Sequence, residues 1–287
     1  MQPAIEVVEH ASAHGAWTLW RRPPAPGLRG WLVDYCGYLE IGGSPVRRRE
    51  LPSPVVPLIL NLGEPWISYD PDRPERQRWL RRSFTAGLHR RHALVGSIGS
   101  ALCLQVDMTP LAARRLFGLP MAELTDAVIE VDDLPGHWLA ELVDRLAETR
   151  CWADRFDLVD RVFSARLGAA PPPSPIALRA WLRLRQCGGN GSISAIAAEL
   201  EVSRMRLHRL FLDGIGLAPK TAARLCRFEA AVAAMQRGEP LAELAADAGY
   251  FDQPHFNREC LAFTGESPSA LRRRMLADGT GIMDQTG

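Results

Sequence analysis

Four prolines within seven residues divide this chain of 287 residues into two parts. The segment 169–175 reads AAPPPSP. Closely spaced prolines favour an extended polyproline II conformation of roughly 3 Å per residue, which fits a semi-rigid spacer and excludes a continuous helix. The chain on each side of it is long enough to bury a hydrophobic core. We therefore predict two domains joined by a proline linker at residues 171–175.

The composition is that of an ordinary soluble protein. Hydrophobic residues make up 47% of the chain and charged residues 23%, which argues against wholesale disorder and against a fibrous repeat. No run of about eighteen apolar residues occurs, so we expect neither a signal peptide nor a membrane span. The six cysteines are scattered without a CxxC pair, which favours single thiols in a reducing cytoplasm.

The part before the linker changes its pattern near residue 108. Short apolar stretches separated by Gly and Pro indicate strands, although Pro52, Pro54 and Pro57 argue against a central strand around them. From residue 109 onward, apolar residues recur three and four positions apart, as in amphipathic helices. We predict a β-rich domain at residues 1–108 with a helical annex at 109–170.

The part after the linker, residues 176–276, has a helical pattern, and we expect a flexible tail at 277–287. Ser192 and Ser203 are placed to cap two consecutive short helices, and Gly214 and Gly216 end the second. Residues 203–227 hold six basic residues and one acidic residue, a net charge of +5, which suits contact with phosphates. Taken alone, this unit is equally a helical hairpin with a solvated charged face.

The same arrangement recurs further along the chain. A short helix near residues 241–245 precedes a turn at Gly249, and Asp252 is placed to cap a helix that ends at Gly265, with Phe256 and Leu261 facing inward. Residues 220–236 between the two units form one predicted helix of roughly 25 Å. A rigid connector of this length can hold two recognition helices about one duplex turn, ~34 Å, apart, in successive major grooves.

These segments resemble the AraC/XylS family of bacterial transcription regulators. The resemblance rests on SISAIAAELEVSRMRLHRLF, GIGLAPKTAARLCRFEAA, LAELAADAGYFDQPHFNREC and FTGESPSALR, and covers residues 177–275. It implies sequence-specific binding of double-stranded DNA, activation through RNA polymerase, an unidentified small-molecule effector, and a sensor or dimerisation domain that forms a homodimer. LRGWLVDYCGYLE and LPSPVVPLILNLG resemble a poorly characterised domain found before such DNA-binding modules.

The expected fold class is therefore α+β. A β-rich domain, cupin-like by the resemblance, is followed by an all-α domain with two helix-turn-helix units joined by a long helix. Carried over by position, the residues expected to contact bases are Met205, His208, Arg209, Gln253, His255, Asn257 and Arg258. Those expected at the DNA backbone are Ser203, Arg204, Arg206 and Asp252. The chemistry agrees, because Arg pairs with guanine, Asn and Gln pair with adenine, and Met contacts the thymine methyl group.

The alternative is a DNA-repair or ligand-modifying enzyme that uses the same module to reach DNA. The sequence contains no G-x-S-x-G, H-E-x-x-H or phosphate-binding loop, and no H-x-H pair of the kind that a cupin metal site needs. His10 with His14 and His89 with His92 have spacings that suit a metal on a helix, but we interpret them as residues of a solvated surface. We predict no catalytic residue, no cofactor and no metal, and assign no effector-binding residue.

Overall fold

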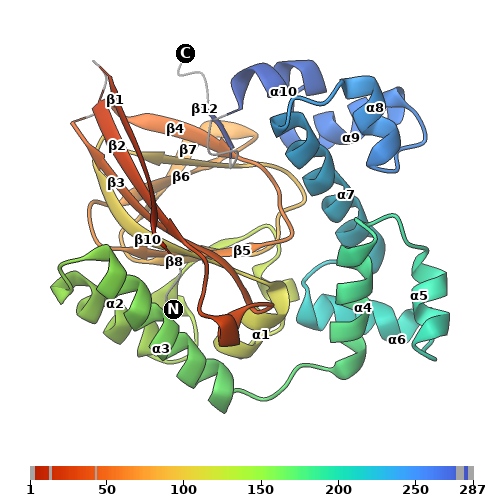
Figure 1. Cartoon of the computed structure of the whole chain (residues 1–287), viewed down its shortest axis with the longest axis horizontal. Coiled ribbons are helices and arrows are strands. Elements are labelled where there is room, and N and C mark those ends of the chain that lie inside the picture. The colour runs from red at the N-terminus through yellow and green to blue at the C-terminus, as the bar shows by residue number, and fades with distance from the viewer. Residues whose placement is uncertain (1–3, 13–14, 43, 276–280, 284–287) are drawn as a thin grey trace.

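A computed structural model describes residues 4–12, 15–42, 44–275 and 281–283 (Figure 1). The N-terminal domain contains two antiparallel sheets. The first has the order β1 (Glu6–Ser12), β2 (Gly15–Arg22), β3 (Leu32–Ile41), β10 (Ala101–Met108), β5 (Val56–Asn61), β8 (Phe84–Ala86) and β11 (Val128–Glu130). The second has the order β12 (Gly281–Met283), β4 (Val46–Glu50), β9 (Ala93–Ser97), β6 (Trp66–Asp70) and β7 (Arg73–Leu80).

Two details of the sheets differ from the prediction. Pro57 lies within β5, a central strand between β10 and β8, and is tolerated there because β8 pairs with β5 only from Leu58 onward. The helical annex also contributes a strand, since β11 pairs with β8 at the edge of the first sheet. Strands as short as β8 and β11, of three residues each, leave no clear alternation in the sequence.

The tail is a third difference. Residues 277–287 were expected to be flexible, but Gly281–Met283 form β12, which pairs with β4 and buries Ile282 completely. Residues 276–280 and 284–287 lie outside the described residues. The pairing brings the end of the chain back onto the N-terminal domain, as Figure 1 shows beside β4. A strand of only three residues is held in place by pairing with its partner strand and not by local β-propensity.

Three α-helices of the annex, α1 (Pro110–Phe117), α2 (Trp138–Glu148) and α3 (Trp152–Ala169), cover the N-terminal domain on one side. The start of α3 packs directly on β3, where a Cβ atom on Gly37 would lie 2.4 Å from the Trp152 ring. Further along, Asp160 accepts a hydrogen bond from the Tyr35 hydroxyl at 2.9 Å and pairs with the buried Arg22. This layer closes the outer face of the first sheet.

The C-terminal part consists of α4 (Pro175–Gln186), α5 (Ile193–Glu199), α6 (Arg204–Gly214), α7 (Pro219–Gln236), α8 (Leu241–Asp247), α9 (Gln253–Thr264) and α10 (Pro268–Arg274). The long helix α7 runs between the α5–α6 pair and the α8–α9 pair (Figure 1). This arrangement, together with the two N-terminal sheets, confirms the expected fold class.

One hydrophobic core runs through both parts of the molecule. Buried residues of α1, such as Leu111, belong to the same cluster as Leu207 and Phe211 of α6. A smaller cluster, which includes Tyr38, Trp66 and Phe84, lies between the two sheets. The proline-containing segment between Ala169 and Pro175 therefore links two parts that also contact each other through packed side chains.

Candidate nucleic-acid interface and interdomain pocket

The first helix-turn-helix unit presents a row of polar side chains on α6. The Ser203 hydroxyl accepts a hydrogen bond from the Arg206 backbone N–H at 3.1 Å, so Ser203 is the N-cap of α6, as predicted. Leu207 and Phe211 are buried against the rest of the domain. The opposite side exposes Arg204, Met205, Arg206, His208 and Arg209. Met205 is 67% exposed, so its side chain is accessible to another molecule.

The second unit repeats this geometry on α9. The Asp252 carboxylate accepts a hydrogen bond from the His255 backbone N–H at 2.6 Å, while Phe256, Cys260 and Phe263 are buried. Gln253, Asn257 and Arg258 are exposed, and His255 is half-buried against the edge of the Tyr250 ring. One expectation was wrong: Leu261 is 56% exposed, because it lies on the side of α9 opposite the buried residues.

Phe251 extends this exposed surface and was not among the predicted site residues. It directly precedes the N-cap Asp252 and is 93% exposed. Its neighbour Tyr250 is buried. The sequence signal was its position within AGYFDQPHF, directly before the capping residue Asp252. Only the structure shows that the Tyr250 ring is buried and the Phe251 ring is exposed.

Two of the six basic residues counted toward the local charge serve the fold. Arg224 pairs with the buried Glu259 at 2.5 Å, and Arg227 lies 3.8 Å from the same carboxylate. Arg227 also donates a hydrogen bond to the Gly189 carbonyl. Both guanidinium groups thus tie α7 to α9 or to the turn before α5. The positive charge available to a polyanion is carried by Arg204, Arg206, Arg209 and Lys220, which are all exposed.

Each of the two units is also fixed to the N-terminal part. At the end of α6, Thr125 donates a hydrogen bond to the Gly216 carbonyl at 2.6 Å, and Arg114 pairs with Asp213 at 3.2 Å. Gly216 has a φ of 90°, and a Cβ atom there would lie 2.8 Å from the Met121 carbonyl oxygen, so the close approach requires glycine.

At the end of α9, Arg49 of β4 donates a hydrogen bond to the Thr264 carbonyl at 2.9 Å and another to Glu266 at 3.2 Å. The His92 backbone N–H donates to the Phe263 carbonyl at 2.7 Å. The second unit is therefore fixed by strand β4 and the start of β9, whereas the first is fixed by the annex.

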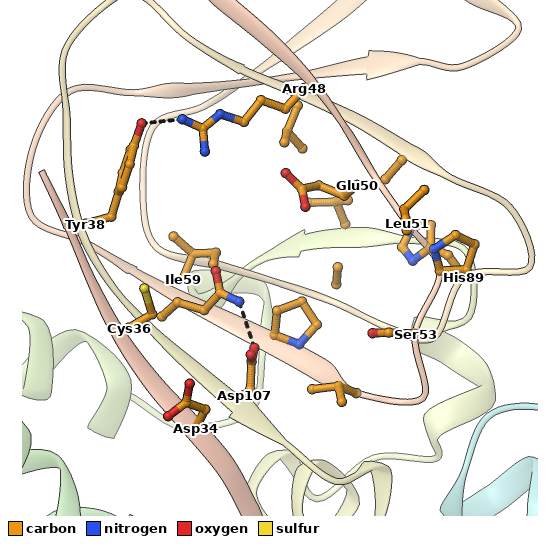
Figure 2. Close-up of a pocket in the computed structure, with 18 of the residues that line it drawn as sticks. Asp34, Cys36, Tyr38, Arg48, Glu50, Leu51, Ser53, Ile59, His89 and Asp107 are labelled. Carbon is orange, nitrogen blue, oxygen red and sulfur yellow. Dashed lines mark hydrogen bonds between the residues drawn. The ribbon is translucent and has the colours of Figure 1, made fainter. Parts of the chain in front are cut away.

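A pocket of about 420 Å³ lies between the two sheets (Figure 2), and residues of α7 line one side of it. Strands β2, β3, β10 and β5 provide one wall, and β4, β6 and β9 provide the opposite wall. Helix α7 contributes Glu229, Val232, Ala233 and Gln236. The pocket is therefore bounded by residues from both domains.

One end of the pocket is organised around Arg48. Its guanidinium donates a hydrogen bond to the Tyr38 hydroxyl and lies over the Tyr38 ring. Tyr38 in turn donates to Glu40 at 3.1 Å, and Ser97 donates to the same carboxylate oxygen at 2.8 Å. The buried Glu40 carboxylate and the Arg48 guanidinium are thereby joined through one hydroxyl in a single hydrogen-bond network.

The other end holds two carboxyl groups that face the same space, Asp34 and Asp107, as Figure 2 shows. Asp107 accepts a hydrogen bond from the Gln105 amide at 2.8 Å. Burial, helped by the nearby Asp34, raises the pKa of Asp107 from 3.8 to about 6, while the Gln105 hydrogen bond and Arg21 act in the opposite direction. The pKa of Asp34 is also raised by burial, with Arg21 acting in the opposite direction.

The histidine pairs do not gather metal ligands. In the part of the chain that the structure describes, no group of three or more His, Cys, Asp or Glu side chains is placed to hold a metal ion. His14 lies outside the described residues. His89 lines the pocket, and its Nδ1 lies 2.8 Å from the Gly87 carbonyl. No helix among the described residues combines the length and the apolar character needed to cross a membrane.

Two family profiles match the chain, one in each part. Residues 196–274 match a family described as a helix-turn-helix domain. Residues 21–130 match a domain of unknown function (DUF6597). The first match contains α6, α7, α8 and α9 in full, and with them every residue predicted to contact DNA. No match was found among curated protein sequences.

Solved structures resemble the chain at low sequence identity. ToxT from Vibrio cholerae O395 is 12% identical, with a TM-score of 0.45 over 91% of this chain and 98% of that one. The AraC-like transcriptional activator CuxR is 18% identical, with a TM-score of 0.30 over 80% of this chain and 87% of that one. A cupin domain from Bordetella pertussis is 15% identical, with a TM-score of 0.18 over 38% of this chain and 97% of that one.

Proposed function

We propose, from the AraC-type helix-turn-helix domain that residues 196–274 form, that this chain is a sequence-specific transcription regulator that reads DNA with α6 and α9. The match itself supports a DNA-binding transcription regulator. The more specific proposal rests on one observation, which is that α6 and α9 are each divided into a buried side and an exposed side. Each buries one side in the domain and exposes, on the other, the side chains that were predicted to contact DNA, except for the half-buried His255.

The exposed residues have the chemistry that base recognition needs. On α6, Arg209 has the fork that pairs with guanine, His208 can donate or accept, and Met205 suits a thymine methyl group. On α9, Gln253 and Asn257 suit adenine, and Arg258 suits guanine. His255, half-buried, is the least accessible of the predicted base contacts. The backbone N–H groups behind Ser203 and Asp252, together with Arg204 and Arg206, suit the phosphates on either side.

Regulation by a small molecule is the second element of the proposal. The pocket is bounded by strands of the N-terminal domain and by α7, the helix that joins the two units. Strand β4 carries Arg48 and Glu50 on the pocket side and Arg49 at the end of α9. A ligand in this pocket would thus contact elements that hold the second unit in position. We further propose a cytoplasmic protein that forms a homodimer and activates transcription by contacting RNA polymerase.

Selection of genomic fragments with the purified full-length protein tests the proposal. Fluorescence anisotropy then compares the best fragment with a scrambled duplex at near-physiological salt. We expect a preference of about a thousandfold or more, carried by two blocks of sequence one helical turn apart. A steep salt dependence without any sequence preference would contradict the proposal, because it would mean that the domain only neutralises phosphates.

A further inference from the structure

The lining of the pocket limits the chemical class of ligand that it can bind. This inference rests on the regulatory role proposed above. We propose that it binds a small organic cation, a protonated amine on an apolar or aromatic body, with the ammonium group at Asp34 and Asp107. Four kinds of observation support this ligand class: the register of the two carboxyl groups, the charges around them, the aromatic wall and an unpaired indole N–H group.

The register of β3 and β10 places the two carboxyl groups side by side. Asp107 pairs directly with Asp34 across the two strands, and both line the pocket. Directly opposed residues of an antiparallel pair have Cβ atoms about 4.5–5.5 Å apart, and like charges in this position destabilise the sheet. An ammonium group between the two carboxylates would remove that repulsion and use the acceptor positions of both.

The other charged groups of the pocket leave this end short of positive charge. Arg21 of β2 faces Cys36 in register and offsets part of the negative charge at both Asp34 and Asp107, but it is one cation beside two carboxyl groups. Arg48 is engaged at the opposite end with Tyr38, and Glu229 pairs with Arg185 on the other side of α7. Burial lowers the pKa of His89, which favours the neutral form of its ring.

The remaining lining suits the body of such a ligand. The aromatic rings of Tyr38, Trp66 and Phe84 pack against one another and line the pocket together with aliphatic side chains such as Ile59 and Val95. Aromatic faces attract organic cations as well as apolar groups. Trp66 is only 9% exposed, and its indole N–H has no hydrogen-bond partner among the described residues. A hydrogen-bond acceptor on the ligand would satisfy this donor.

Three probes of nearly equal shape separate the ligand classes by calorimetric titration of the full-length protein at pH 7.5. Tyramine carries an ammonium group, 4-hydroxyphenethyl alcohol carries none, and 3-(4-hydroxyphenyl)propionate carries a carboxylate. We expect tyramine to bind at least tenfold more tightly than the other two. Asp107→Asn keeps the size of the side chain and is expected to weaken tyramine binding at least tenfold. Asp144→Asn, on the exposed side of α2, is the matched control and is expected to change nothing.

Tightest binding of the propionate, equal binding of all three probes, or no binding at all would overturn the inference. So would undiminished tyramine binding by both Asp107→Asn and the second variant, Asp34→Asn. DNA binding measured by anisotropy on the same preparations separates this inference from the proposed function. Sequence-specific DNA binding without a response to tyramine overturns the ligand class alone. Tyramine binding without sequence-specific DNA binding overturns the regulatory role and leaves the amine site in place.

Discussion

Arg209 and Arg258 occupy equivalent positions, each six residues after the N-cap of its helix. Both are exposed, and each can form a two-point hydrogen bond with a guanine. We expect Arg209→Ala or Arg258→Ala to weaken binding to the selected site by about 1–3 kcal/mol and to relax base preference at one position. Arg206→Ala should instead weaken binding to all sequences alike, since a phosphate contact carries no sequence information. Anisotropy titrations with single-base variants of the site distinguish these patterns.

Phe251 and Phe256 are a matched pair for separating binding from stability. Phe251 is exposed just before α9, whereas Phe256 is a buried residue of α9. We expect Phe251→Ala to reduce affinity for the selected DNA site while changing the free energy of unfolding by no more than about 0.5 kcal/mol. Phe256→Ala should destabilise the fold by about 3–5 kcal/mol. Unchanged affinity in Phe251→Ala would show that this ring lies outside the DNA interface.

Asp107 gives the stability of the protein a specific pH dependence. Its pKa is raised by burial from 3.8 in an open environment to about 6 in the fold, so the folded state retains a proton that the unfolded chain releases. The contribution of Asp107 to stability therefore falls as the pH rises from about 4 to about 6, and stays low above that range. Asp107→Asn carries no charge at any pH. We expect it to be more stable than the unmodified protein at pH 7 and equally stable near pH 4 in urea unfolding, whereas a pH-independent difference would contradict this.

At the scale of single elements, β12 makes the end of the chain part of the N-terminal sheet. Ile282 is fully buried at this contact, and β4 would become an edge strand without it. We expect Ile282→Ala to lower the free energy of unfolding by roughly 2 kcal/mol or more and to speed hydrogen exchange at the β4 amides. Ile41→Ala, at a largely exposed position of β3, should stay within about 0.5 kcal/mol. Equal effects of the two substitutions would argue against a paired tail.

The sequence predicted the elements whose signals are local. Ser203 and Asp252 mark the starts of α6 and α9, and Gly265 marks the end of α9 in the left-handed conformation, because capping depends on a few neighbouring residues. Strands β11 and β12 could not be predicted, since each is held by a partner strand distant in the sequence. The pocket was missed for the same reason: only the register of β3 and β10 brings Asp34 opposite Asp107.

At the scale of the whole molecule, α6 and α9 are each held to the N-terminal part at their C-terminal end. The end of α6 is fixed to the annex through Thr125 and Arg114, and the end of α9 to β4 through Arg49. Helix α7, at 18 residues or about 27 Å, links the two units. Continuous helix and packed contacts of this kind resist changes in the separation of α6 and α9, so one molecule should accept only one spacing of its two DNA sequences.

This rigidity makes the spacing of the DNA site a test of which helices read it. If α6 and α9 of one molecule read two blocks in successive major grooves, their centres lie about 10–10.5 base pairs apart. Inserting five base pairs turns the second block to the opposite face of the duplex, and inserting a full turn moves it about 34 Å further away. We therefore expect both insertions to reduce affinity, measured by anisotropy, to that of a single block. Recovery with the full-turn insertion would mean that the blocks are read by two protomers of a dimer, because separate protomers can bind on the same face at a greater distance.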